Sequence, residues 1–229
     1  MLLIFDIDDT LIDTSGTLIP PLLKNALTVL NQRGVVIGNF DKAYASLLHI
    51  DKVSISSEAA LHEFIELHGG KKQDFDHALK EIYMPSELPK KVETLEGAVP
   101  LLQEIAKNFP LCIVSKGVEA IQKEKLQKAG IPLTLFDHIL ISENPQKKGQ
   151  YLKILNRSGI PPEKILVIGD RISRDLTPAK ELGMSTVHMK WGRGLGYTGI
   201  KTDVDYTITS LEELKDILEE LSKEGYTHV

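Results

Sequence analysis

The chain begins with a short apolar run that ends in a group of aspartates, Leu2-Leu3-Ile4-Phe5-Asp6-Ile7-Asp8-Asp9-Thr10-Leu11. A run this apolar, without alternation of polar and apolar residues, is typical of a parallel strand covered on both faces. Side chains alternate along an extended segment, so Asp6 and Asp8 point to the same side. Two carboxylates in one pocket repel each other unless a cation or a proton is present. The stretch therefore predicts a metal site or a nucleophile beside an acid; the alternative is a solvated strand end with turn-forming aspartates.

A second run of the same kind, Ile165–Ile168, leads into Gly169-Asp170, and Asp175 follows in the first turn of an expected helix. Ligands of open α/β sheets bind beyond the carboxyl ends of the strands, where both aspartate groups would lie. Oxygen ligands with room for water suit Mg²⁺. Asp175 taken alone is explained equally well as an acid that favours a helix N-terminus.

Two further segments offer groups that bind phosphate. A third apolar run, Leu111–Val114, delivers Ser115 with Lys116 and Gly117 next, and a hydroxyl beside a helix start makes a phosphate-binding corner. Lys147 and Lys148 precede the helix that leads back to Gly169-Asp170. One lysine there would neutralise both a phosphate and the aspartates, although each segment by itself is also common at strand ends and on surfaces.

The rest of the chain predicts an α/β fold with a helical insertion. Apolar runs predict strands at residues 2–6, 111–115, 139–142, 165–170, 186–189 and 206–208, and helical periodicity lies between them from about residue 97 onward. This alternation predicts a doubly wound parallel sheet with right-handed crossovers. Residues 17–93 show helical periodicity without a convincing strand. We therefore expect an α/β core from residues 1–15 and 94–229 and a helical domain from residues 16–93, which would close over the core site.

The composition of the chain favours a small molecule as its binding partner. The chain has 229 residues and a formal charge of -5, from 27 basic and 32 acidic residues, with no long run of either sign. Such a balance offers no electrostatic footprint for nucleic acid or an anionic membrane. Only five residues precede Asp6, too few for a signal peptide, and no run reaches membrane-spanning length, so we expect a cytoplasmic protein. The single cysteine, Cys112, is expected to be a buried strand residue.

Taken in order, these segments resemble the motifs of the haloacid dehalogenase-like (HAD) superfamily of hydrolases. Residues 6–11 match its first motif, Ser115 its second, a lysine at 147 or 148 its third, and Gly169-Asp170-Arg171-Ile172-Ser173-Arg174-Asp175 its fourth. The resemblance covers the whole chain and implies a Rossmann-like α/β core with a small helical cap inserted after the first motif. It also implies a magnesium-dependent phosphatase that acts on a small phosphorylated metabolite.

The resemblance implies a role for each matching residue. Asp6 would be the nucleophile that forms an aspartyl-phosphate, and Asp8 the general acid and base. Asp6, Asp170 and the backbone carbonyl of Asp8 would hold Mg²⁺, with Asp175 assisting directly or through water. Thr10 would support the loop. Ser115 and a motif lysine would bind the phosphate. Lys148 is the preferred lysine, because a Lys-Gly pair that opens a helix is a form found in the family. Lys116 would either bind anionic groups of the substrate or be a solvated surface lysine.

Two alternatives stay open at this point. A phosphomutase of the same family would use the same Asp pair to return the phosphoryl group to a sugar, and a non-catalytic binding protein would keep the fold alone. Dehalogenase chemistry is disfavoured, because the resemblance implies that this branch lacks an acid two residues after the nucleophile. The identity of the phosphate ester and the choice between a monomer and a homodimer are not decided by the sequence.

Overall fold

The computed structural model describes residues 1–144, 146–196 and 199–223 and divides the chain into two compact units. The first unit comprises Met1–Asp13 and Lys91–Val229, and the second comprises Thr14–Lys90. These boundaries lie within a few residues of the predicted ones. None of the described helices combines the length and the apolar character that crossing a membrane requires.

The first unit is built on a six-stranded parallel sheet with the strand order β3-β2-β1-β4-β5-β6. The strands are β1 (Leu2–Phe5), β2 (Leu111–Lys116), β3 (His138–Ser142), β4 (Ile165–Gly169), β5 (Ser185–Met189) and β6 (Tyr206–Ile208). Each predicted run forms a strand, and every residue of β1 and β4 is buried. The predicted doubly wound α/β fold is confirmed.

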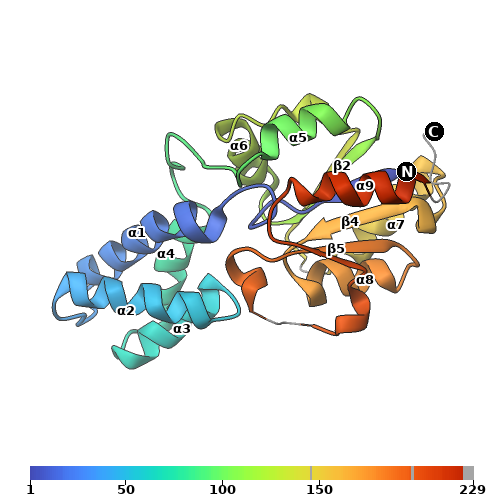
Figure 1. The fold of residues 1–229 in the computed structure, drawn as a ribbon. Coiled ribbons are helices and arrows are strands. Elements are labelled where there is room, and N and C mark those ends of the chain that lie inside the picture. The colour runs from blue at the N-terminus through green and yellow to red at the C-terminus, as the bar shows by residue number, and fades with distance from the viewer. Residues whose placement is uncertain (145, 197–198, 224–229) are drawn as a thin grey trace. The chain divides into compact units, whose positions relative to one another are not determined.

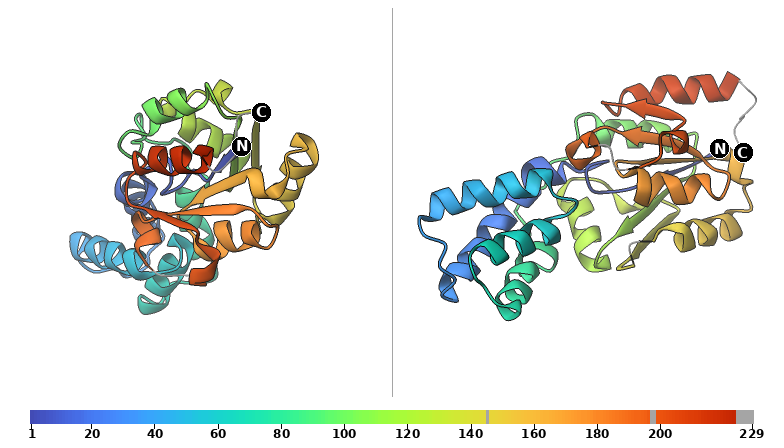
Figure 2. Two further views of the ribbon diagram at one scale, coloured as in Figure 1. Left: turned by 45° about the vertical axis from the view of Figure 1, so that its right-hand side comes forward. Right: turned by 90° about the horizontal axis from the view of Figure 1, so that it is seen from below.

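Helices cover both faces of this sheet (Figures 1 and 2). On one face lie α5 (Ala98–Ile105), α6 (Glu119–Lys128) and α9 (Glu213–Lys223), and an ion pair between Glu104 and Lys215 joins α5 to α9. On the other face, α7 (Lys148–Ser158) and α8 (Thr177–Lys180) contribute Tyr151, Ile154 and Ala179 to one apolar cluster with residues of β1, β2 and β4. Two covered faces explain why the strands are continuously apolar.

The order of the strands places the candidate residues at one point of the sheet. The chain runs outward from β1 through β2 to β3 and then from β4 through β5 to β6, so the direction of winding reverses between β1 and β4. These two strands pair in register from Leu2 with Ile165 to Phe5 with Ile168. Their carboxyl ends, which carry Asp6 and Asp170, therefore meet at the position where open α/β sheets form a ligand-binding crevice.

The second unit is entirely helical within its regular elements. Its helices are α1 (Ile19–Gln32), α2 (Phe40–Val53), α3 (Ser57–Leu67) and α4 (Lys72–Tyr83). Each supplies apolar residues to one buried cluster, such as Leu27, Leu47, Phe64 and Ile82. Residues typical of helix starts and helix breaks lie at the helix ends: Pro20 stands in the first turn of α1, and Gly69 and Gly70 separate α3 from α4.

Cys112 has the structural role expected of it. It lies in β2 with its side chain fully buried. Burial raises the pKa of its thiol to about 12, so the reactive thiolate is not formed near neutral pH.

Candidate active site

Asp6 stands directly after β1 at the start of a tightly folded loop. Its backbone N–H donates to the carbonyl of Ile168 at 2.9 Å, which fixes the Asp6 backbone against β4. The N–H groups of Leu11 and Ile12 both donate to the carbonyl of Ile7 at 3.0 Å, so the loop closes on itself. Thr10 is fully buried inside this loop, and the structure gives its hydroxyl no hydrogen-bond partner.

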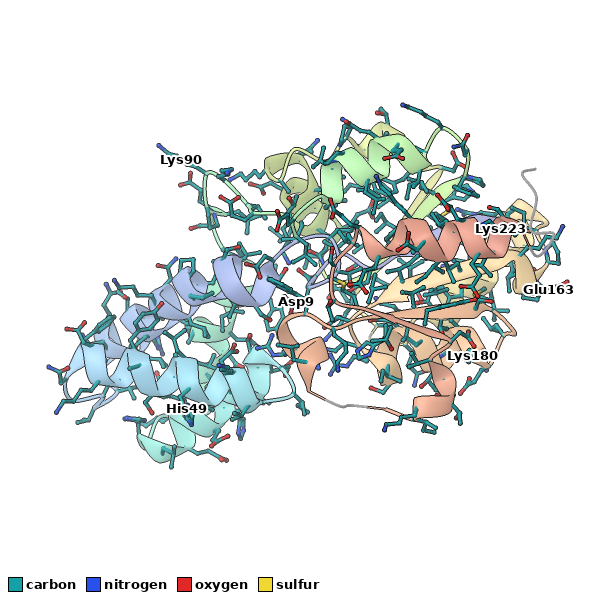
Figure 3. All side chains as sticks on the ribbon, in the orientation of Figure 1. Asp9, His49, Lys90, Glu163, Lys180 and Lys223 are labelled. Atoms are coloured by element: carbon teal, nitrogen blue, oxygen red, sulfur yellow. The ribbon has the colours of Figure 1, made fainter. Side chains whose placement is uncertain are left out.

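The loop is completed by Asp9 and by a glycine from the segment after β5. Asp9 has a φ of 57°, the left-handed conformation that short polar residues tolerate, and its place on the loop after β1 is marked in Figure 3. Gly192 packs so closely on the Asp9 carboxylate that a Cβ atom at residue 192 would collide with it. Nearby, Trp191 Nε1 donates to Asp13 Oδ1 at 2.8 Å. The segment after β5 therefore supports the loop after β1.

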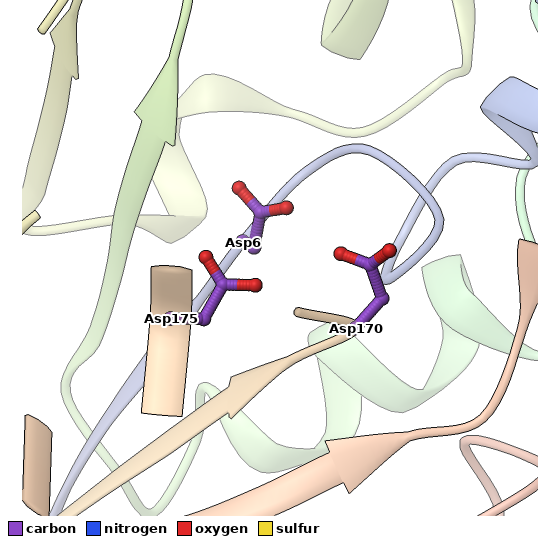
Figure 4. A group of neighbouring side chains, drawn as sticks. All are labelled: Asp6, Asp170 and Asp175. Carbon is purple, nitrogen blue, oxygen red and sulfur yellow. The ribbon is translucent and has the colours of Figure 1, made fainter. Parts of the chain in front are cut away.

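Three buried carboxylates, those of Asp6, Asp170 and Asp175, form the centre of the site (Figure 4). Each offers an oxygen within 4.8 Å of the other two. Asp6 follows β1, Asp170 follows β4, and Asp175 lies in the short helical segment Ile172–Leu176. Gly169 makes this approach possible, because a Cβ atom there would lie only 2.6 Å from Asp175 Cβ. The carboxylate of Asp8 is not a member of this group.

The electrostatics of this group leave negative charge uncompensated. Burial raises the pKa of Asp6 to about 6, with Lys147 opposing the rise and Asp175 and Asp8 adding to it. Burial, followed by the charges of Asp175 and Asp6, also raises the pKa of Asp170 well above its ordinary range. Three hard oxygen donors with this charge excess are the ligand set that Mg²⁺ prefers, so the residues fit the cation that the motifs imply.

Lys147 is the cation that the structure places between Asp6 and Asp175. Its Nζ lies 2.7 Å from Asp6 Oδ1 and 2.6 Å from Asp175 Oδ1, and its side chain is 5% exposed. Burial would lower the pKa of this ammonium, but Asp175 and Asp6 outweigh burial and raise it above its ordinary value. Lys147 is therefore charged at all physiological pH values.

The structure does not place Lys148, the preferred motif lysine, at the site. Lys148 is the first residue of α7 and its Nζ lies 2.7 Å from Glu181 Oε2, with 46% of its side chain exposed. Consecutive residues at a helix start point in directions about 100° apart, so only one of two neighbouring lysines reaches the carboxylates. The expectation for Lys148 is therefore corrected, and Lys147 takes the position.

The remaining predicted residues, Asp8, Ser115 and Lys116, lie near Gln122 of α6. Ser115 is buried at the end of β2, and its Oγ accepts a hydrogen bond from Gln122 Nε2 at 3.0 Å. The same amide nitrogen lies 2.8 Å from Asp8 Oδ2, so Asp8 and Ser115 share one partner. The side chain of Lys116 is exposed, which agrees with the solvated alternative for this lysine.

Sequence reasoning missed three residues that contact the predicted ones. Gln122 and Lys125 of α6 both bind the Asp8 carboxylate, and Tyr151 of α7 donates to the backbone carbonyl of Asp175 at 3.1 Å. Gln122 and Lys125 are three residues apart and so share a helix face. That spacing was the available signal, but polar residues on one face of a helix are usually solvated.

Comparison with known proteins agrees with this geometry. The sequence profile of the haloacid dehalogenase-like hydrolases matches residues 1–183. A glyceraldehyde 3-phosphate phosphatase of Pyrococcus furiosus is 29% identical over 238 aligned residues, which cover 94% of this chain and 91% of that protein. A pyrimidine 5'-nucleotidase of Escherichia coli is 29% identical over 168 residues, covering 68% of this chain and 67% of that one.

A solved structure shows the same fold. YfnB from Bacillus subtilis, in a magnesium-bound crystal form, superposes with a TM-score of 0.66 at 21% identity, covering 95% of this chain and 97% of that one. The profile match covers the helical unit, the α/β unit as far as residue 183, and the motifs that form the carboxylate site. The resemblance inferred from those motifs is thus confirmed, and the chain is an enzyme that belongs to the haloacid dehalogenase-like hydrolase family.

Proposed function

We propose that this enzyme hydrolyses a small phosphate monoester in a magnesium-dependent reaction, with Asp6 as the nucleophile and Asp8 as the general acid and base. The observation that carries the proposal is Lys147, which is buried between Asp6 and Asp175 at the carboxyl ends of β1 and β4. A carboxylate repels a phosphate dianion unless fixed positive charge offsets the repulsion. Lys147 supplies one such charge, and the three carboxylates supply ligands for a second.

In the first step, a carboxylate oxygen of Asp6 attacks phosphorus and the bond from phosphorus to the ester oxygen breaks. Asp8 gives its proton to the departing alcohol oxygen. In the second step, water attacks phosphorus of the aspartyl-phosphate and loses a proton to Asp8, which releases phosphate and regenerates Asp6. Lys147, bound to Oδ1, fixes the orientation of the Asp6 carboxylate throughout.

Asp6, Asp170 and Asp175 would hold the magnesium ion, with the backbone carbonyl of Asp8 as a further proposed ligand. When bound, such a cation neutralises charge on the transferring phosphoryl group. The buried Ser115 hydroxyl would donate to a phosphoryl oxygen. Arg171, whose Nε lies 3.2 Å from Asp170 Oδ2, would hold the Asp170 carboxylate in place.

The substrate class is proposed from the relatives. The P. furiosus relative acts on glyceraldehyde 3-phosphate and the E. coli relative on pyrimidine 5'-nucleotides. These two kinds of ester, a three-carbon phosphate and a nucleoside monophosphate, are the first substrates to test. Selection between them by the helical unit, the cytoplasmic location and the choice between monomer and homodimer stay predictions.

A panel of phosphorylated metabolites, assayed for released inorganic phosphate with Mg²⁺ and with a chelator, tests the proposed function. We expect release from at least one of the two proposed classes, and only with Mg²⁺. Transfer of the phosphoryl group to a second sugar without free phosphate would favour the phosphomutase alternative. If neither the metabolite esters nor an aryl phosphate were turned over, both the phosphatase proposal and the phosphomutase alternative would be contradicted.

Thermal unfolding provides a test of the metal site that does not depend on turnover. The pKa of Asp6 is raised in the folded chain from 3.8 to about 6. A raised carboxyl pKa means that its contribution to stability is present below the unfolded-state value and is lost as pH rises through the folded-state value. In a chelator, Tm should therefore fall between pH 5 and pH 7.

Magnesium should reverse this loss, because a cation that binds the ionised carboxylates stabilises the folded state. At 100 times its Kd the gain is about 2.7 kcal/mol, or roughly 5–10 °C in Tm for a chain of this size. We expect the gain to be larger at pH 7 than at pH 5. The Asp170→Asn protein should lose most of the gain, and an unchanged gain would remove Asp170 from the metal site.

A further inference from the structure

Two residues of α6 bind the carboxylate of Asp8 from the same helix face. Gln122 Nε2 lies 2.8 Å from Asp8 Oδ2, and Lys125 Nζ lies 2.9 Å from Asp8 Oδ1. Each carboxylate oxygen thus has its own donor on α6. A carboxyl group held at both oxygens has its plane fixed, whereas one held at a single oxygen can still rotate. Each oxygen keeps a second lone pair, which can carry the proton that Asp8 transfers.

Gln122 connects Asp8 to the phosphate-binding corner. It is 2% exposed, and its Nε2 also lies 2.9 Å from the backbone carbonyl of Lys116 and 3.0 Å from Ser115 Oγ. The carboxylate and the carbonyl only accept hydrogen bonds, so they set the orientation of the amide. The Ser115 oxygen is a third acceptor for this nitrogen, so its two hydrogens are shared among three acceptors. Its hydroxyl hydrogen is then available for a different acceptor, which suits donation to a phosphoryl oxygen.

Lys125 differs from two neighbouring lysines of the same helix. Lys123 and Lys128 form ion pairs with Glu119 and Glu124, one turn away on α6 itself. Lys125 instead reaches off the helix to the loop after β1, and its side chain is only 13% exposed. A partly buried ion pair between different elements restricts the position of its carboxylate more than an exposed pair within one helix.

We propose that Gln122 and Lys125 are positioning residues that hold the Asp8 carboxylate in one orientation and at a fixed place relative to the Ser115 hydroxyl. This inference rests on the proposed function, because it assumes that Asp8 protonates the leaving oxygen. The two residues act through Asp8 and Ser115 and need no contact with the substrate. Their effect should therefore depend on how much the leaving group needs a proton.

The test compares an aryl phosphate, whose leaving oxygen departs without a proton, with a primary alkyl phosphate, whose leaving oxygen needs one. The variants are Gln122→Leu and Lys125→Met, and kcat/KM is measured for both esters because it reports the step in which the alcohol leaves. We expect the alkyl ester to lose on the order of 10- to 100-fold more than the aryl ester, which is at or below the lower end of the roughly 10²- to 10⁴-fold contribution of general acid catalysis. Lys125→Arg, which keeps the charge, should recover most of the loss.

Matched controls lie on the same helix. Lys123→Met removes a lysine that pairs with Glu119, and Gln127→Leu removes an exposed glutamine. Both should leave the ratio of the two esters unchanged. Equal losses on both esters in the Gln122 and Lys125 variants would overturn the inference while the proposed function stands.

A second readout keeps the two hypotheses separate. If the unaltered protein cleaves no ester, the proposed function fails, and crystal structures then decide the positioning role on its own. The Gln122→Leu, Lys125→Met double variant should show the Asp8 side chain in a different rotamer or in several. An unchanged Asp8 rotamer in that variant would overturn the inference.

Discussion

Replacing Asp6 by Asn is expected to abolish magnesium-dependent phosphate release, with a loss on the order of 10³-fold or more in kcat. The amide has nearly the same shape as the carboxylate but is a far weaker nucleophile towards phosphorus. The fold should persist, because Lys147 keeps its 2.6 Å contact with Asp175 Oδ1. Initial rates on the best ester of the panel, at saturating Mg²⁺, measure the loss.

The covalent intermediate offers an independent readout of the same variant. A rapidly quenched reaction of the unaltered protein should contain a chain heavier by one phosphoryl group, located on the peptide that carries Asp6. The Asp6→Asn protein should show no such mass. Asp41→Asn, an exposed aspartate on α2, serves as the matched control and should behave like the unaltered protein. Retention of more than a tenth of the activity by Asp6→Asn would remove Asp6 from the role of nucleophile.

The fold and the carboxylate group could be predicted because their signals are local in the sequence. A strand covered on both faces must be apolar at every position, as in β1 and β4, so its ends are visible where aspartates begin. Parallel strands bring their carboxyl ends to one edge of the sheet, which joins Asp6 to Asp170 although they are distant in sequence. Asp175 follows Asp170 closely enough to share the site.

The contacts that could not be predicted depend on the directions in which side chains point, and the local sequence does not determine these directions. Lys147 and Lys148 are neighbours of the same residue type, and their roles differ only because α7 begins at Lys148 and turns its side chain towards Glu181. Gln122 was missed for a related reason. A glutamine on a polar helix is normally solvated, and only the packing of α6 beside β2 and the loop after β1 buries it at 2% exposure.

The choice between the two lysines yields the second large prediction. Lys147→Met should lower kcat/KM by about 10²- to 10³-fold, the usual cost of removing one fixed donor from a charged transition state. Two effects combine in this variant. The phosphoryl group loses a cation, and Asp6 loses the charge that opposes the burial-driven rise of its pKa, so the pKa rises further and less of the nucleophile is ionised at neutral pH.

Lys148→Met is the matched control, because it removes the same charge one residue along the chain from a pair that is about half exposed. Its kcat/KM should stay within about twofold of the unaltered protein.

Lys147→Met also leaves buried carboxylates without their cation, a change that costs about 3–5 kcal/mol in comparable buried pairs. Rates are therefore compared per folded molecule at saturating Mg²⁺. Magnesium should restore part of the lost stability, because it supplies positive charge to the same carboxylates. It should not restore the lost rate, because the hydrogen bond from Lys147 to Asp6 Oδ1 also fixes the orientation of the nucleophile. If both variants kept the rate of the unaltered protein, neither lysine would contribute its charge to the reaction. A larger loss for Lys148→Met than for Lys147→Met would require α7 to begin in a different register from the one described.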